Sequence, residues 1–329
     1  MYESHLLPES GGRYMTVVHH TLSAGDGHSI HITTAGSPDG IPIVSFHGGP
    51  GSGSNASMMR PFDLSRFFVV LIDQRGSGRS SPSGRIARNS TSWLLRDVEA
   101  VRAHLGISRW YVLGGSWGAT LAIAYSGSHP EAVSGLILRG TFLASGQEVR
   151  GLLSASRTRA PRAWLDLYRA SGADRPSAMM SAMYARLRQG GPTAWRVAQA
   201  YSALERAMLA RCNRHMSSRT RRQNTLQQRR QAAKYLIQVH YLWNACGLRG
   251  GRLAQLAAQA HAHGIVGTAV HGKRDPVCPL ANLAWLKTHM PNIKQICVNA
   301  GHLATDPPIY AALVSVLDEI ARQHARNVT

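Results

Sequence analysis

Acidic side chains are scarce in this chain of 329 residues. Asp and Glu together number 17 against 37 Lys and Arg, so the formal net charge is +20 with histidine counted as neutral. Charged residues make up 16% of the chain and hydrophobic residues 44%. Such a composition supports a sizeable core, excludes general disorder and favours one large domain, alone or with an insertion.

Cysteine is also rare, and long apolar runs are missing. The four cysteines, Cys212, Cys246, Cys278 and Cys297, show neither CxxC pairing nor metal-ligand spacing, which argues against a disulfide framework or a zinc ribbon. No stretch approaches the roughly 18 apolar residues that span a bilayer. Residues 1–14 are polar and lack the apolar centre of a secretory signal. We therefore expect a cytoplasmic globular protein that needs no membrane, metal or other cofactor.

The positive charge is concentrated in the middle of the chain. Residues 145–260 hold 20 Lys or Arg against four acidic residues, a net +16, while the rest of the chain sums to +4. One interpretation is a solvated helical surface. The other is a positively charged binding surface for an anionic partner or substrate, such as an acidic carrier protein, a phosphorylated ligand or nucleic acid.

The first 140 residues alternate between strand-like and helix-like patterns. Short apolar runs at 41–46, 67–72, 110–113 and 133–138 are typical of buried strands, and the amphipathic stretch 91–105 is typical of a helix. Alternating strands and helices predict an α/β fold with a doubly wound, mostly parallel sheet.

A long helical block interrupts this alternation. Residues 145–260 are rich in Ala, Leu, Arg and Gln, strand-like segments resume at 265–271 and 293–298, and a helix is expected at 308–322. This order is typical of a sheet domain that carries an inserted cap. We therefore expect a core in two parts, 1–144 and 261–329, and a strongly basic helical cap at 145–260.

The strongest local motif is the GxSxG at residues 114–118. It directly follows the strand-like WYVL and directly precedes a helical run, so the strand, the serine and the helix occur in the order of a nucleophile elbow. Small residues on both sides permit a sharp turn that exposes the Ser116 hydroxyl. The helix N-terminus behind it favours developing negative charge.

A serine hydroxyl needs a base, and the expected order is Ser, Asp, His. Asp275 follows one strand-like segment and His302 follows the next, so both are expected at the same edge of the sheet. We predict them as the acid and the base. Other histidines are interpreted as surface or core residues, namely His19, His20, His104, His215, His240 and His289.

Stabilisation of the oxyanion requires two backbone donors. The N–H of Trp117, the residue after the nucleophile, is one candidate. The second is expected from the glycine-rich turn HGGPG at 47–51, where glycines let the backbone approach the substrate closely. The neighbouring turn at 73–80 is interpreted mainly as structural, tied down by Asp73 and Arg75.

Six motifs of the core segments are found together in one known family. They are HGGPG at 47–51, DQRGSGRS at 73–80, GGSWGATLA at 114–122, LRGTF at 138–142, HGKRDPVCP at 271–279 and NAGH at 299–302. The chain thereby resembles proline iminopeptidase, a serine aminopeptidase family of the α/β-hydrolase fold that removes N-terminal proline from peptides. The resemblance is nearly continuous from about residue 25 to 302 in the core and loose in the cap.

The resemblance implies an acyl-enzyme mechanism. Ser116 would be the nucleophile, His302 the general base and then acid, and Asp275 the residue that orients the imidazole. Gly49 and Trp117 would donate to the oxyanion. Three further side chains would lie at or beside the proline pocket: Phe142, Arg139 and Cys278.

In that family, acidic side chains of the cap bind the free amino group of the substrate. Glu205 falls at one acidic position, but Gln238, within IQVHY at 237–241, stands where the family has glutamate. An amide binds an ammonium about half as well as a carboxylate does. The departure is compatible with a relaxed aminopeptidase or with a relative recruited to another acyl substrate.

Three functions follow from these observations. The first is a prolyl-type aminopeptidase acting on peptides or amides. The second keeps the triad and acts as an esterase, a thioesterase or an acyl-transferring or cyclising enzyme on a biosynthetic, carrier-bound intermediate. The third is nucleic-acid binding, which the lack of a recognised fold and of interleaved aromatic residues disfavours. Nucleic-acid binding would depend on five arginines: Arg219, Arg221, Arg222, Arg229 and Arg230.

Overall fold

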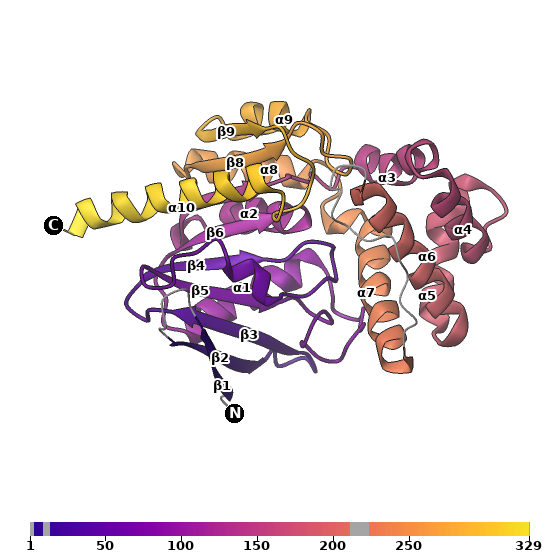
Figure 1. Cartoon of the computed structure of the whole chain (residues 1–329), viewed down its shortest axis with the longest axis horizontal. Coiled ribbons are helices and arrows are strands. Elements are labelled where there is room, and N and C mark those ends of the chain that lie inside the picture. The colour runs from indigo at the N-terminus through magenta and orange to yellow at the C-terminus, as the bar shows by residue number, and fades with distance from the viewer. Residues whose placement is uncertain (1–2, 9–13, 211–223, 329) are drawn as a thin grey trace.

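The body of the protein is built on one nine-stranded sheet. The computed structural model describes residues 3–8, 14–210 and 224–328 (Figure 1). The strand order is β1-β2-β3-β5-β4-β6-β7-β8-β9, and every pair from β5 to β9 is parallel. The predicted α/β class is confirmed. The parallel strands are β4 (Ile41–Phe46), β5 (Phe67–Asp73), β6 (Trp110–Gly115), β7 (Val133–Arg139), β8 (Gly267–Gly272) and β9 (Ile293–Val298).

An antiparallel edge, which the sequence analysis did not predict, extends the sheet on one side. It comprises β1 (Glu3–Pro8), β2 (Tyr14–Ser23) and β3 (Ser29–Gly36). β2 and β3 mix histidine and threonine with aliphatic residues, so they lack the continuous apolar runs of the central strands. Their polar side chains pair across the strands instead, as His19 Nδ1 lies 3.0 Å from Thr33 Oγ1.

Helices cover both faces of the sheet. Apolar residues of α1 (Thr91–His104), α2 (Trp117–Ser128), α8 (Arg252–Ala262) and α9 (Asn282–His289) pack into one core. α10 (Pro307–Val328) packs into a second core, where Ile309, Leu313 and Leu317 recur at helical spacing. Short helical turns are η1 (Ala56–Met59), η2 (Pro130–Ala132), η3 (Pro176–Ala178) and η4 (Ala245–Gly247).

Among the described residues between β7 and β8, five helices form a cap with its own apolar core (Figure 1). α8 also falls within residues 145–260, which were expected to form the cap, but it lies on the body. There Leu253, Leu256 and Ala260 join the same core as α2. No helix in the described ranges is long and apolar enough to span a bilayer. The cap helices are α3 (Gly146–Arg159), α4 (Pro161–Ser171), α5 (Met179–Gln189), α6 (Gly191–Ala210) and α7 (Thr225–Trp243).

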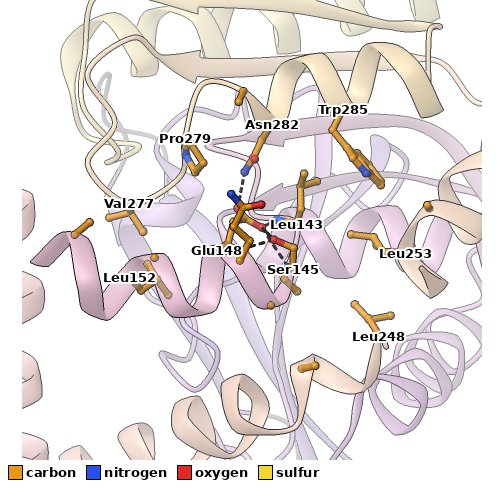
Figure 2. A pocket seen from close by; sticks show the side chains of 18 of the residues that line it. Leu143, Ser145, Glu148, Leu152, Leu248, Leu253, Val277, Pro279, Asn282 and Trp285 are labelled. Atoms are coloured by element: carbon orange, nitrogen blue, oxygen red, sulfur yellow. Dashed lines mark hydrogen bonds between the residues drawn. The ribbon is translucent and has the colours of Figure 1, made fainter. Parts of the chain in front are cut away.

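Glu148 anchors the first cap helix to the body (Figure 2). Its Oε2 accepts the backbone N–H of Leu143 at 3.0 Å, and its Oε1 accepts Nδ2 of Asn282 at 2.6 Å. Burial raises the pKa of Glu148, and these hydrogen bonds oppose that rise in part. A cavity of about 920 Å³ opens beside this anchor, and its described lining contains neither Ser116 nor His302.

Candidate active site

Ser116 occupies a sharp turn between β6 and α2. Its backbone has φ 57° and ψ −122°, a conformation that non-glycine residues rarely adopt. A Cβ on Gly114 would lie 2.2 Å from the carbonyl oxygen of Gly118, and one on Gly118 would lie 2.3 Å from that of Phe46. Both glycines are therefore required by close backbone contacts, which explains the GxSxG pattern in physical terms.

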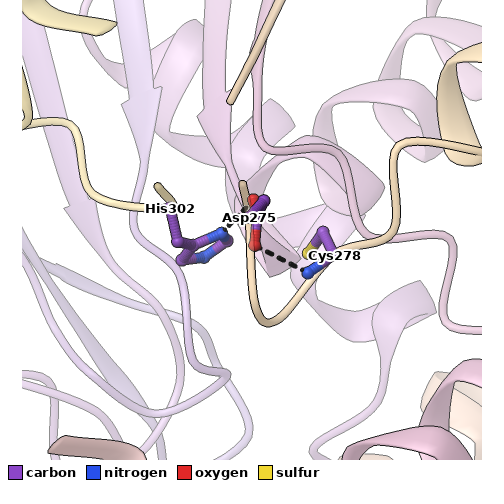
Figure 3. Close-up of side chains that lie close together, drawn as sticks. All are labelled: Asp275, Cys278 and His302. Atoms are coloured by element: carbon purple, nitrogen blue, oxygen red, sulfur yellow. Dashed lines mark hydrogen bonds and ion pairs between the residues drawn. The ribbon is translucent and has the colours of Figure 1, made fainter. Parts of the chain in front are cut away.

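Asp275 and His302 form a buried, hydrogen-bonded pair (Figure 3). His302 Nδ1 donates to Asp275 Oδ2 at 2.6 Å, and the side chains are 9% and 1% exposed. Asp275 Oδ1 accepts the backbone N–H groups of Val277 at 2.8 Å and Cys278 at 2.9 Å. Burial alone would raise the pKa of Asp275, but His302 and these donors outweigh it and lower the pKa. An ionised carboxylate thus fixes the imidazole tautomer with its proton on Nδ1.

The Cys278 thiol lies next to this pair. Burial raises the pKa of Cys278 well above its usual value, and a hydrogen bond with Ser116 opposes this only in part. Ligand-type atoms of Asp275, Cys278 and His302 lie within 4.8 Å of one another, an arrangement that could hold a metal ion. Hydrogen bonds already engage both Asp275 oxygens, however, so an acid–base pair accounts for the geometry.

The HGGPG loop packs directly against the elbow. Gly49 has φ 116°, which favours glycine. A Cβ on Gly48 would lie 3.4 Å from the Cβ of Ser116. Trp117 is the first residue of α2, so its backbone N–H has no acceptor within the helix. The predicted oxyanion donors lie on the two sides of this contact, Gly49 in the glycine-rich loop and Trp117 at the start of α2.

A hydrogen-bond network that the sequence analysis missed joins these two sides. Gln74 Nε2 donates to the carbonyl oxygen of His47 at 2.9 Å, and Trp117 Nε1 donates to Gln74 Oε1 at 2.8 Å. The backbone N–H of Gln74 donates to His47 Nε2 at 3.1 Å, so His47 is neutral and donates from Nδ1 to Gly48. Burial lowers the pKa of His47 accordingly. Gln74 thereby fixes the glycine loop relative to the elbow.

Replacing Gln74 should therefore impair catalysis more than binding. We expect Gln74→Leu to lower kcat about tenfold with little change in KM, because the oxyanion donors lose their fixed spacing. Steady-state kinetics on a p-nitrophenyl ester measure this. The matched variant Gln323→Leu, on the exposed face of α10, should keep both constants. An unchanged kcat in Gln74→Leu would show that the network serves folding alone.

Most predicted site residues line one cavity of about 280 Å³ between cap and body. This volume is at the small end of ligand cavities, which run from about 300 to 1,000 Å³. Asp275, Trp117 and Cys278 are not among its lining residues, and Asp275 lines the neighbouring cavity of about 920 Å³ instead. The predicted residues that line it are Gly49, Ser116, Arg139, Phe142, Glu205, Gln238 and His302.

Arg139 also contacts the predicted base. Its Nη1 donates to the carbonyl oxygen of His302 at 2.6 Å. A Cβ on Gly115 would lie 2.1 Å from Arg139 Nη2, so the guanidinium passes directly beside the elbow. The residue was expected beside the pocket, and its contacts tie the His302 loop to the end of β7.

Glu205 is the one acidic residue among the described residues lining the cavity. Its Oε1 accepts Gln238 Nε2 at 2.6 Å, and its Oε2 accepts the Tyr235 hydroxyl at 2.7 Å. Lys234 Nζ lies 3.4 Å from Oε2. Burial favours the neutral acid, but the Lys234 charge and these hydrogen bonds outweigh it and lower the pKa of Glu205. Neither Lys234 nor Tyr235 was predicted, although both precede Gln238 on one helix.

The end of α7 is fixed to the body. His240 Nε2 lies 2.8 Å from the carbonyl oxygen of Asn89, and the Tyr241 hydroxyl donates to Asn89 Oδ1 at 2.7 Å. The Tyr241 ring also packs on Trp117, with 5.1 Å between centroids. His240 is therefore a structural residue, and it helps to place Gln238 over the site.

A serine at a strand–helix elbow, a buried Asp–His pair and a glycine-rich loop, all on a mostly parallel sheet, define an α/β hydrolase. The family model described as alpha/beta hydrolase fold matches residues 41–306. The protein is thus a hydrolase of this class, as the sequence predicted.

Within that class the chain belongs to the proline iminopeptidase family. It is 36% identical over 309 residues to a proline iminopeptidase of Xylella fastidiosa, covering 91% of this chain and 95% of the relative. Identity to that of Xanthomonas citri is 35% over 312 residues, covering 92% and 96%. The crystal structure of a Mycobacterium smegmatis proline iminopeptidase is similar in fold, with TM-score 0.61 and 18% identity over 94% of this chain and all of that one. The predicted family is confirmed.

Proposed function

We propose that the protein is a serine aminopeptidase that releases an N-terminal proline or small residue from peptides or amides. The observation that carries the proposal is the cavity itself. It joins the Ser116 nucleophile and the His302 base at one end to an ionised carboxylate, Glu205, contributed by the cap. A free amino terminus is a cation, and a carboxylate binds it through a charge-assisted hydrogen bond. The names of the relatives support the same substrate class.

The chemistry proceeds through an acyl-enzyme. Ser116 Oγ attacks the carbonyl carbon while His302 Nε2 takes the hydroxyl proton, and Asp275 stabilises the resulting imidazolium. The N–H groups of Gly49 and Trp117 stabilise the oxyanion. His302 then protonates the leaving nitrogen, and a water that it deprotonates releases the acyl group and restores Ser116. Arg139 keeps the base in position through the His302 carbonyl group.

The substrate pocket explains the restriction to small N-terminal residues. Its small volume and buried Phe142 side chain suit a compact apolar ring near the serine. Glu205 sets the distance from the amino group to the scissile bond, as an exopeptidase requires. Cys278 stands behind Ser116 and shapes that wall without reaching the cavity.

The test compares a prolyl anilide, its N-acetylated form and a p-nitrophenyl ester. We expect kcat/KM for the free amine to exceed that for the acetylated form about 100-fold, because acetylation removes a hydrogen bond to a charged group. Glu205→Gln should remove most of this preference, while Glu131→Gln, at an exposed site, should keep it. Ester cleavage without amine preference would instead support the esterase, thioesterase or acyl-transfer alternative.

The proposal also covers the cellular location of the protein and its binding partners. We propose a cytoplasmic enzyme, which the free thiols of Cys246, Cys278 and Cys297 support, and an anionic partner or substrate tail at the basic cap. Binding to an acidic protein and binding to DNA, each measured at low and at moderate salt, show which of these two kinds of anionic partner the cap prefers. Arg229 and Arg230 are exposed on α7, whereas the other arginines considered for nucleic acid lie outside the described residues: Arg219, Arg221 and Arg222.

A further inference from the structure

The carboxylate of the cavity already has a cation next to it. Lys234 Nζ lies 3.4 Å from Glu205 Oε2, and both side chains are 30% exposed. The same ammonium lies 4.6 Å from the centroid of the Tyr235 ring, so both the Glu205 carboxylate and this ring stabilise the Lys234 charge. With Gln238 neutral, the described residues that line the cap end of the cavity carry no net charge. A substrate ammonium therefore meets a carboxylate that is already neutralised.

Hydrogen-bond accounting shows what remains free on Glu205. Its two oxygens offer about four acceptor sites. Gln238 uses one on Oε1, while Tyr235 and Lys234 use both on Oε2. One site is left. A prolyl terminus is a secondary ammonium with two N–H donors, so it needs either a second acceptor nearby or the site that Lys234 fills.

Gln238 supplies the second acceptor. The residue is 5% exposed and its side chain contacts the Tyr201 hydroxyl, but no described residue donates to its Oε1 with normal hydrogen-bond geometry. Its orientation is fixed, because Glu205 only accepts hydrogen bonds and the amide must turn Nε2 toward it. The carbonyl oxygen is then left as a buried acceptor on a residue that lines the cavity. A buried acceptor without a partner is costly, and a ligand donor would satisfy it.

We propose that Lys234 is a specificity-determining residue, which neutralises Glu205 in the free enzyme and so weakens the attraction of this carboxylate for the amine of the substrate. The two N–H donors of a prolyl terminus then bind Glu205 and Gln238 Oε1. Lys234 thereby sets how strongly this end of the cavity binds a substrate ammonium. This inference rests on the proposed aminopeptidase function and concerns the amine-binding end of the same site.

The first test is Lys234→Met, which keeps the length of the side chain and removes its charge. We expect KM for a prolyl anilide to fall about fivefold, because a partly exposed ion pair no longer competes. kcat should change less than KM. The control Lys287→Met, on the exposed face of α9, should leave both constants unchanged. An unchanged or higher KM in Lys234→Met would overturn the proposal.

The pH dependence separates competition from a merely structural role. Lys234 helps to lower the pKa of Glu205, so wild-type KM should stay flat well into the acid range. Without Lys234 that pKa rises, and Glu205 becomes protonated at a higher pH. The KM advantage of Lys234→Met should therefore be full at neutral pH and shrink as the pH falls. A pH-independent change would contradict competition for the carboxylate.

A second variant tests the charge balance without removing the lysine. Gln238→Glu adds a carboxylate beside Glu205, so the single charge of Lys234 no longer neutralises this end of the cavity, and KM for prolyl anilide should fall. An unchanged or higher KM would show that this charge does not set the affinity for the amine and would overturn the proposal.

The test also works if the proposed function fails. Should the wild type cleave an ester but no prolyl anilide, prolinamide is used as an inhibitor of ester hydrolysis. A lower inhibition constant in Lys234→Met than in the wild type would support the competition. Equal constants, or no inhibition of either protein, would refute it.

Discussion

Ser116→Ala should lower kcat about a million-fold on both an ester and a prolyl anilide. The reason is the position of the hydroxyl at the strand–helix elbow, with His302 lining the same cavity. Alanine keeps the Cβ and therefore the local packing, so circular dichroism and the melting temperature should match the wild type. Retention of most activity would remove the serine-hydrolase mechanism altogether.

The elbow offers an internal control for this experiment. Ser116 has a positive φ that favours glycine, so Ser116→Gly should be more stable than Ser116→Ala by about 1 kcal/mol although both are inactive. Thermal unfolding of the two variants measures the difference. Equal stabilities would show that the turn is unstrained.

Local motifs made the arrangement of the candidate catalytic residues predictable from the sequence. GxSxG requires glycines at two close backbone contacts, and these contacts leave a signature that can be read without a structure. Asp275 and His302 were predictable because both directly follow strands, whose ends meet at one edge of a parallel sheet. The central strands, buried on both faces, likewise give continuous apolar runs.

Long-range contacts explain what could not be predicted. Gln74 connects two loops through its amide, and nothing near it in sequence indicates Trp117 as its partner. The contact of Lys234 with Glu205 could not be predicted either, because it forms only in the fold, where α6 places Glu205 beside α7. The packing of α8 on the body could not be predicted for a similar reason. α8 has the same helical composition as the cap, and only packing on α2 assigns it to the body.

Asp275→Asn should lower kcat about ten-thousand-fold while leaving the fold intact. The asparagine Oδ1 would still accept the backbone N–H groups of Val277 and Cys278, because both contact Oδ1 of the aspartate. The new Nδ2 would replace Oδ2, which faces His302 Nδ1. A donor would then face a donor unless the ring moves its proton to Nε2.

That proton shift accounts for the size of the expected loss. An imidazole protonated on Nε2 cannot take the proton of Ser116, so the base is present in the wrong tautomer. Initial rates on the ester and the prolyl anilide should fall together, since the acyl-transfer step is common to both. The matched control is Asp318→Asn. Asp318 lies on α10 and forms an exposed ion pair with Arg66, so this variant should keep full activity. A loss below tenfold in Asp275→Asn, with the melting temperature preserved, would mean that His302 is oriented by its backbone contact with Arg139 alone.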